Sequence, residues 1–221
     1  MLVGVRGPRW RSLTAVVLSA ASLFAAPAST AGNDSAALRA AAAAGDWKQI
    51  QAMGPGVLPS LAGLYASSSE QEKAKVAYVF YQLGWKSPEA KRALMADVHT
   101  QDQALRLQVQ WALGRVSDDP DVVDVLLENM QRDPVPLFRD KAACALAYDQ
   151  IHLAPAQRLR LFEGLIQALD SETLQVRQIA LQALQILTGQ SKGFLPAAEP
   201  GTRRGAVLEW KRWLAEYRSN L

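Results

Sequence analysis

The chain is poor in the residues that build disulfide frameworks, metal sites and β-sheets. Its 221 residues include one cysteine, Cys144, and two histidines, His99 and His152. A single cysteine excludes an internal disulfide framework, and neither histidine lies in the His-x-x-x-His or Cys-x-x-Cys setting of a zinc site. Alternating apolar and polar runs rich in β-branched residues are also absent, so no strand is predicted. We therefore expect an all-α chain with no metal and no cofactor.

Recognisable catalytic motifs are missing as well. The sequence has no Gly-x-Ser-x-Gly elbow, and Gly54-Pro55-Gly56 lacks the lysine and the preceding strand of a phosphate-binding loop. No histidine lies near Cys144 in the sequence, so the thiol is expected to be a buried small side chain rather than a nucleophile. The sequence therefore predicts no catalytic residue.

Residues 1–31 have the layout of a secretory signal peptide. Arg6, Arg9 and Arg11 precede an apolar run of 14 residues, 13–26, and small residues follow it. An uncleaved membrane anchor is the alternative, but a span needs roughly 20 apolar residues. We expect a protein that is secreted across the inner membrane into the periplasm and is not stably inserted in the membrane after cleavage.

Loss of this segment changes the charge balance of the protein. The whole chain has 24 Lys and Arg residues against 21 Asp and Glu residues, a net charge of +3. Residues 1–31 contain three arginines and no acid, so the remainder carries 21 residues of each sign. A neutral chain lacks the basic footprint of a nucleic-acid-binding protein. No nucleic-acid partner is therefore expected.

One helical pattern recurs every thirty-odd residues along the remaining chain. It appears as LRLQVQWALGRV from Leu105, FRDKAACALAYD from Phe138 and VRQIALQALQIL from Val176. Each copy opens with an apolar residue followed by arginine, and an Ala-Leu pair stands seven and eight positions further on. The arginines, 33 and 38 residues apart, are Arg106, Arg139 and Arg177. A period of this size predicts stacked helix pairs.

The repeated pattern, apolar-Arg-x-x-Ala-Ala-x-Ala-Leu, resembles the short HEAT repeats of bacteria. Ser87-Pro88, Asp119-Pro120 and Ala154-Pro155 precede the first helix, A, of successive pairs, and the pattern marks the second helix, B. The resemblance covers about residues 55–190, although Val76 stands at the arginine position of the first pair. It implies a right-handed α-solenoid of about four helix pairs, with the B helices lining the concave wall.

The tail resembles a segment that follows bacterial HEAT arrays. LTGQSKGFLP is followed by AVLEWKRWLAEY, in which Trp210 and Trp213 fall on one helix face. Together with Val207 and Leu214, they are expected to cover the last repeat, because the end of a solenoid must be capped. The domain prediction is a signal peptide at 1–31, a solenoid at 32–190, and a loop plus C-terminal capping helix at 191–221.

Registration of the repeats predicts a partner-binding strip. Counted from the opening apolar residue, the core lies at positions four, seven, eight and eleven, while positions three, six and ten fall on another side of the helix. The first repeat is aligned on its Leu83-Gly84 end. The candidate binding residues are Tyr78, Tyr81, Trp85, Gln108, Trp111, Arg115, Lys141 and Tyr148. Aromatic residues and arginine are favoured in binding hot spots, but packing between neighbouring B helices is the alternative for these side chains.

These observations favour a non-enzymatic protein-binding or scaffold module of the cell envelope, which recognises a protein or peptide on its concave face. One alternative is an enzyme or enzyme subunit, because some short HEAT proteins are similar to phycobilin lyases. Another is an inert structural spacer in an envelope complex. An aromatic and basic groove would favour the binding module. A uniformly polar concave wall would favour the spacer, and a deep pocket that gathers histidine and acids would favour the enzyme.

Cleavage of the signal peptide is directly testable. Because small residues follow the apolar run, we expect the native protein to begin near Ser29 or Gly32 and to occur outside the cytoplasm. Terminal sequencing of protein from separated cell fractions measures both properties. Protein that begins at Met1 and resides in the cytoplasmic fraction would contradict export.

Overall fold

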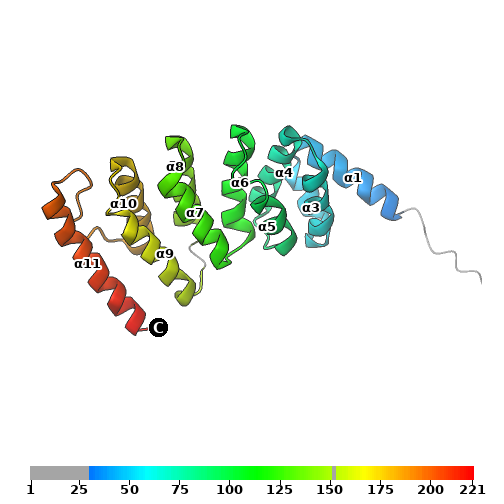
Figure 1. Ribbon diagram of the computed structural model, residues 1–221. Helices are drawn as coiled ribbons and strands as arrows, with labels where there is room; N and C mark the ends of the chain where they lie inside the picture. The colour runs from blue at the N-terminus through cyan, green and yellow to red at the C-terminus, as the bar shows by residue number, and fades with distance from the viewer. Residues whose placement is uncertain (1–29, 151–152) are drawn as a thin grey trace, which may run out of the picture.

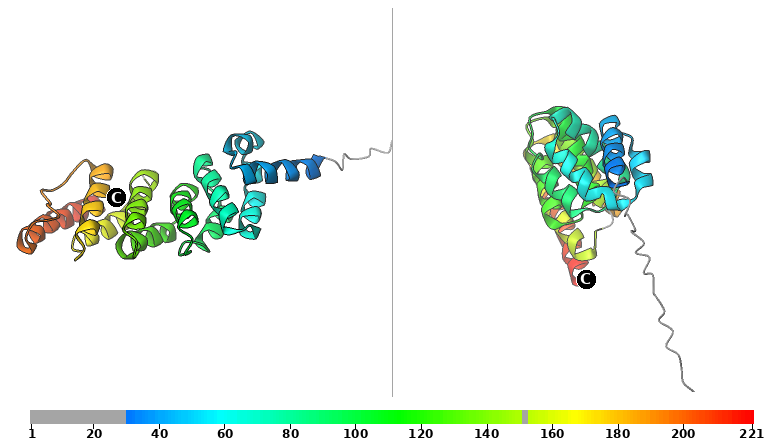
Figure 2. Two further views of the ribbon diagram at one scale, coloured as in Figure 1. Left: turned by 90° about the horizontal axis from the view of Figure 1, so that it is seen from above. Right: turned by 90° about the vertical axis from the view of Figure 1, so that its right-hand side faces the viewer.

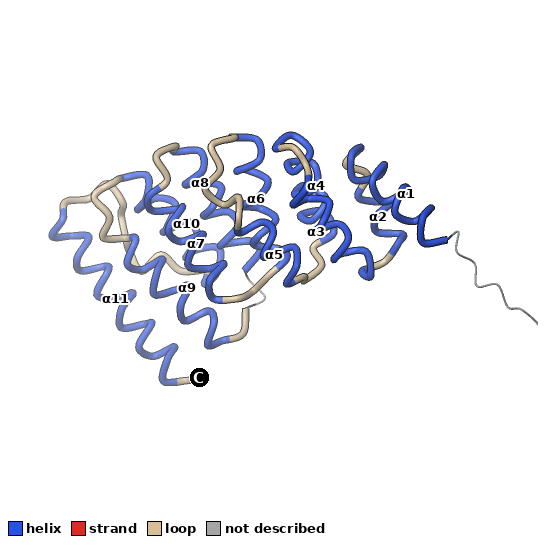
Figure 3. Tube along the Cα trace, turned by 45° about the vertical axis from the view of Figure 1, so that its right-hand side comes forward, coloured by secondary structure: helices blue, strands red, loops and turns tan. Residues whose placement is uncertain are grey.

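Helices form all the regular structure that is described, and they stand side by side along one axis. The computed structural model describes residues 30–150 and 153–221, and no β-strand occurs within these ranges (Figure 3). The array runs from α1 at one end to α11 at the other (Figures 1 and 2). The all-α solenoid prediction is therefore confirmed. The predicted signal peptide lies outside the described residues except for its last two positions, and stays a prediction.

Four helix pairs form the body of the array. The A helices are α3 (Leu58–Ser67), α5 (Pro88–Met95), α7 (Pro120–Arg132) and α9 (Pro155–Ala168). The B helices are α4 (Glu70–Leu83), α6 (Gln103–Val116), α8 (Pro136–Cys144) with its continuation η2 (Ala145–Asp149), and α10 (Leu174–Thr188). Each B helix packs against the next one along the array. We call the surface that these B helices share the B-helix face.

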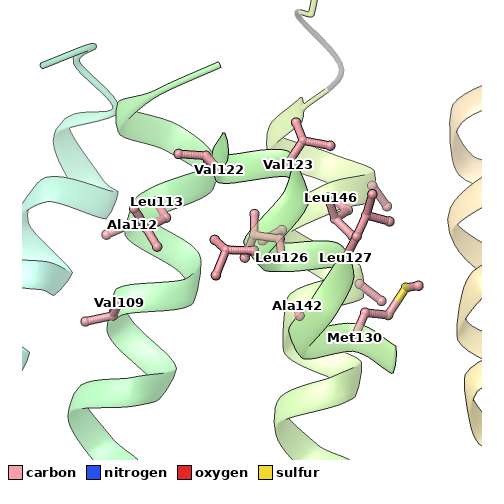
Figure 4. Packing of buried hydrophobic residues seen from close by; sticks show 14 of the residues in the cluster. Val109, Ala112, Leu113, Val122, Val123, Leu126, Leu127, Met130, Ala142 and Leu146 are labelled. Carbon is pink, nitrogen blue, oxygen red and sulfur yellow. The ribbon is translucent and has the colours of Figure 1, made fainter. Parts of the chain in front are cut away.

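Additional helices close the two ends. Before the first pair lie α1 (Thr30–Ala44), α2 (Trp47–Met53) and the short turn η1 (Pro55–Val57). Helices α1 and α2 pack on α4 and bury Leu38 and Ile50. After the last pair, α11 (Pro200–Ser219) packs on α9. The core is thus continuous from end to end, as Figure 4 illustrates for the apolar residues of α6, α7 and α8.

Local capping explains where several helices begin. The hydroxyl of Ser87 accepts a hydrogen bond from the backbone N–H of Ala90 at 3.1 Å, and Pro88 occupies the first turn of α5. Asp102 caps α6 in the same way by accepting from Leu105 at 2.7 Å. Asp119, which directly precedes α7, makes no such bond to that helix. Its carboxylate instead lies 2.6 Å from Nζ of Lys91 on α5.

The repeated arginines bond both to the turn before their own B helix and to the next segment of the array. Nη1 of Arg139 donates to the carbonyl of Asp133, and Nη1 of Arg177 donates to the carbonyl of Ser171, both at 2.7 Å and both six residues upstream. The other guanidinium nitrogens reach forward: Nε of Arg139 donates to Gln175 at 2.9 Å, and Nε of Arg177 to the carbonyl of Pro196 at 2.8 Å. Charge-assisted hydrogen bonds of this kind fix the spacing of the pairs.

Arg106 fills the same register position with different partners. Its Nη1 lies 3.4 Å from the Asp133 carboxylate in the turn after α7, and its guanidinium carbon lies 4.1 Å from the centre of the Phe138 ring on α8. It therefore also bridges two successive pairs. The buried cation is compensated by a carboxylate and by an aromatic face.

The third B helix departs from the uniform helix that the repeated pattern predicts from Phe138 onward. It is α-helical to Cys144 and then continues as the π-helical turn η2. The wider turn places Asp149 and Gln150 against the end of α6, where the side-chain amide of Gln150 donates to the carbonyls of Gly114 at 2.7 Å and Ser117 at 3.2 Å. The spacing of apolar residues along one helix does not predict such contacts with a distant segment.

The C-terminal cap has two parts. In the loop after α10, Phe194 is buried and Pro196 accepts the bond from Arg177. In α11, Trp210 and Val207 are buried, and Trp213 packs edge-on against Phe162 of α9 with ring centres 5.0 Å apart. The helix therefore covers mainly the A side of the last pair, whereas the loop bonds to its B helix.

Trp210 should be the main anchor of the cap. Its side chain is fully buried, so Trp210→Ala is expected to lower the free energy of unfolding by about 3–5 kcal/mol, and Trp213→Ala by less because that ring is half-exposed. Leu208→Ala, at an exposed position of the same helix, should stay within about 0.5 kcal/mol. Urea denaturation of the three variants measures this order. A Trp210→Ala protein with wild-type stability would show that the helix is not a packed cap.

Candidate functional site

All eight predicted binding residues lie on or directly after the first three B helices, and all keep solvent-accessible surface. Tyr78 is 36% exposed and Tyr148 is 58% exposed, while the other six are half-buried. Residues at the core positions of the same helices, such as Val109 and Leu113, are fully buried. Exposure makes the eight residues available to a partner, and their role in binding stays a prediction.

Three of these residues form one cluster across α4 and α6. The rings of Tyr81 and Trp111 have centres 5.8 Å apart and planes inclined by 34°. The guanidinium of Arg115 lies 4.5 Å from the Tyr81 ring centre, and its Nη1 donates to the Tyr81 carbonyl at 3.0 Å. The two interpretations of these aromatic residues therefore overlap: the rings pack between neighbouring B helices and still reach the surface.

Arg115 also connects this cluster to the third pair. Its Nε donates to the Asp149 carboxylate at 3.1 Å. Burial raises the pKa of Asp149 above its ordinary value, although the positive charge of Arg115 opposes that shift. The ion pair fixes the guanidinium plane, so that the remaining edge of Arg115 is presented in a defined orientation.

Successive depressions run along the B-helix face. The first, of about 370 Å³, is mainly apolar and is lined by Tyr78, Leu107 and Gln108 together with the end of α1. The second, of about 260 Å³, lies beside Arg115 and is bounded by Lys86 and Tyr148. The third, of about 50 Å³, separates η2 from α10 and includes Tyr148, Ile179 and Ile186. Tyr148 therefore stands between the second and third depressions.

The other predicted residues are distributed around this row. Trp85 is half-buried and packs against the core just after α4. Lys141 is paired with Asp140, whose carboxylate lies 3.0 Å from its Nζ. Neither residue joins the cluster formed by Tyr81, Trp111 and Arg115 in any ring contact or ion pair of the described residues.

Sequence reasoning missed Asp149 and Lys86. Asp149 stands at position eleven of its repeat, where Val116 and Leu187 stand in the neighbouring repeats, so an acid at a core position was an available signal. Lys86 follows Trp85 outside the repeated pattern, and only the close approach of the ends of α4 and α6 brings it beside Arg115. No periodicity marks such a residue.

The described residues contain no grouping typical of metal chemistry. Within 30–150 and 153–221, no set of three or more His, Cys, Asp and Glu side chains comes together in a way that would hold an ion. Burial raises the pKa of the Cys144 thiol, which disfavours the reactive thiolate form. His99 is exposed, and His152 lies outside the described residues. None of the described helices has the length and apolar character needed to cross a bilayer.

A groove on the opposite side differs in chemistry. It measures about 400 Å³ between α7 and α9 and is lined mainly by charged and amide side chains. Nε of Arg160 lies 2.7 Å from the Asp124 carboxylate across it. Its charges are largely satisfied within the protein, in contrast to the accessible aromatic rings of the B-helix face.

Comparison with protein families agrees with this architecture in the central part of the chain. Residues 58–147, from the start of α3 into η2, match the family model described as HEAT repeats. Among solved structures, the chain is similar to a designed armadillo repeat protein, YIII(Dq.V1)4CPAF in complex with peptide (KR)4, at 16% identity and a TM-score of 0.49. That match covers 81% of this chain and 92% of the designed chain. No curated protein matches the sequence.

Gly114 tests the contact between α6 and η2 that supports the site. A Cβ atom there would lie 2.9 Å from Cβ of Asp149 and 3.3 Å from Cβ of Ala145, so Gly114→Ala should cost about 1–3 kcal/mol by overpacking. Gly63→Ala on α3 is the matched control. Its Cβ would meet nothing within 4 Å, and it should stabilise the protein by about 0.5–1 kcal/mol. Equal unfolding midpoints for both variants would disprove the close contact.

Proposed function

We propose that this protein is a non-enzymatic binding module of the cell envelope, which holds a segment of a protein or peptide partner on its B-helix face. The supporting observation is the row of depressions between successive B helices, which Tyr78, Arg115 and Tyr148 line. Tyr81 and Trp111 form one cluster with Arg115. Tyrosine and tryptophan provide large contact areas that lose little conformational entropy on binding. Both are enriched with arginine in binding hot spots.

The stacked architecture favours recognition of an elongated segment. Each helix pair repeats the same element, so each junction between B helices offers one depression to successive side chains of a partner. The rings of Tyr81 and Trp111 are already packed together, and Arg115 is already held by Asp149. Such preorganisation reduces the entropic cost of binding.

The two alternatives fit the surface less well. A spacer needs no accessible aromatic residue, yet Tyr148 exposes more than half of its surface beside Lys86 and Arg115. An enzyme would need a pocket that gathers acid–base groups. Charged side chains in the three depressions are a few lysine, arginine and aspartate residues, with no histidine among the residues that line them. The envelope location rests only on the layout of residues 1–31.

Tyr148 is the cleanest probe of the proposed binding face. Because it is 58% exposed, Tyr148→Ala should leave stability within about 0.5 kcal/mol of wild type. If it is a hot spot, the substitution should weaken binding by roughly 1–4 kcal/mol, about 5- to 1000-fold. Peptides selected from a random displayed library against the wild-type chain, and candidates captured from envelope extract, provide the partners for titration. Arg115→Ala should weaken the same interactions.

Matched controls separate binding from folding. Leu208→Ala removes an equally exposed apolar side chain from α11, and Arg132→Ala removes an exposed arginine from α7. Both should keep wild-type affinity and wild-type melting. Trp111→Ala is informative only when both properties are measured, because its ring is half-buried. If the selected peptides bind the Tyr148→Ala and Arg115→Ala variants as tightly as wild type, the binding site lies elsewhere on the protein.

A further inference from the structure

Buried polar side chains concentrate where the second helix pair meets the third. Of the eight buried polar or charged residues within the described part of the chain, six lie on or next to α6, α7 and η2. They are Arg106, Gln110, Ser117, Asn129, Asp133 and Gln150. Elsewhere in the described chain, the largest buried side chains are apolar or aromatic, such as Tyr65 and Phe80 in the first pair and Trp210 in the cap. Of these, Tyr65 and Trp210 each have one buried polar atom without a hydrogen bond within the described part of the chain, against two for Gln110.

Several of these groups have no hydrogen-bond partner among the described residues. Both polar atoms of the Gln110 side chain are unpaired although the residue is 0% exposed, and so is Nδ2 of Asn129, at 4% exposure. Nε of Arg106 and Oε1 of Gln150 are likewise unpaired. A buried polar group without a partner disfavours the closed interface by roughly 1–3 kcal/mol.

The helix register places these groups on facing surfaces. The Asp133 carboxylate, just after α7, pairs with Arg106 near the start of α6, and Asp119 precedes α7 just beyond the end of α6. Helices α6 and α7 therefore run antiparallel. Gln110 lies one turn after Arg106 on the same stripe of α6, and Asn129 lies one turn before Asp133 on α7. The polar stripe of α6 thus faces the third pair along two helical turns.

The rest of the junction consists of apolar packing between the helices and of ion pairs near their ends. Leu113 of α6 and Leu126 of α7 belong to the apolar layer shown in Figure 4. On the B-helix face the two halves are joined by the ion pair of Arg115 and Asp149, and on the A side by Lys91, whose Nζ lies 2.6 Å from Asp119. Partly exposed ion pairs of this kind contribute little net stability.

We propose that this junction is a hinge, at which the solenoid opens as two units, the helices up to α6 and the helices from α7 onward. In a stack whose stability is a sum of pair and interface contributions, the interface with the most unpaired buried polar groups opens first. The candidate binding cluster lies across this hinge, because Arg115 belongs to the first unit and Asp149 to the second. Opening would therefore change the width of the second depression, where Tyr148 and Arg115 meet.

Distances between spin labels test the hinge in the full chain. With Cys144→Ala as the background, Arg92→Cys and Glu128→Cys place exposed labels on α5 and α7, across the hinge. Glu128→Cys and Gln167→Cys place the matched control pair on α7 and α9, within the second unit. We expect the pair across the hinge to give a distance distribution at least twice as broad as the control pair. Equal widths would overturn the proposal.

A repacked junction gives the second test. Gln110→Leu combined with Asn129→Leu removes the unpaired polar atoms, and leucine already occupies the Gln110 register position in α10, at Leu181. We expect hydrogen exchange in α6 and α7 to slow at least tenfold and the broad distribution across the hinge to narrow. Gln178→Leu, at an exposed position of α10, should change neither. A folded double variant with unchanged exchange would also overturn the proposal, and the spin-label comparison remains decisive if the variant does not fold.

Discussion

The structure depends on the fact that none of its helices can bury an apolar stripe alone. Helices of 8–15 residues in the four pairs are too short to be stable by themselves, so each must lie between neighbours. Stacking supplies those neighbours in one dimension, and the arginine at the start of the later B helices fixes each step by bonding forward into the following segment. The buried core extends through all four pairs, and α1, α2 and α11 cover its two ends.

One-dimensional stacking separates stability from recognition. Core positions of the B helices face the A helices and the neighbouring pairs, which leaves one side of every B helix open to solvent. On that side the sequence places aromatic side chains in the first pairs and Tyr148 in the third. The junctions that hold the array together also set the spacing of the depressions. A change in packing between two pairs would therefore change that spacing at the proposed binding face. The polar junction after α6 is where we propose that the array opens.

Much of the fold was predictable because its information is local. The helix starts at Ser87 and Asp102, the equivalence of Arg139 and Arg177, and the burial of Trp210 all follow from short-range spacing. The residue before a helix does not always cap it: the Asp119 carboxylate binds Lys91 on another helix instead of α7. The break of the third B helix into η2 was missed, since its cause is the contact of Asp149 and Gln150 with α6, more than thirty residues away.

The sequence by itself determined the class of fold, the approximate number of pairs and the side of each B helix that faces solvent, because helical periodicity and capping act over a few residues. Only the tertiary structure decided that Tyr81, Trp111 and Arg115 form one cluster, that Asp149 holds the arginine, and that the Gln110 side chain has no hydrogen-bond partner among the described residues. Those properties depend on the offset between neighbouring pairs. That offset is set by packing between side chains distant in sequence, and a repeat pattern read along one chain does not contain it.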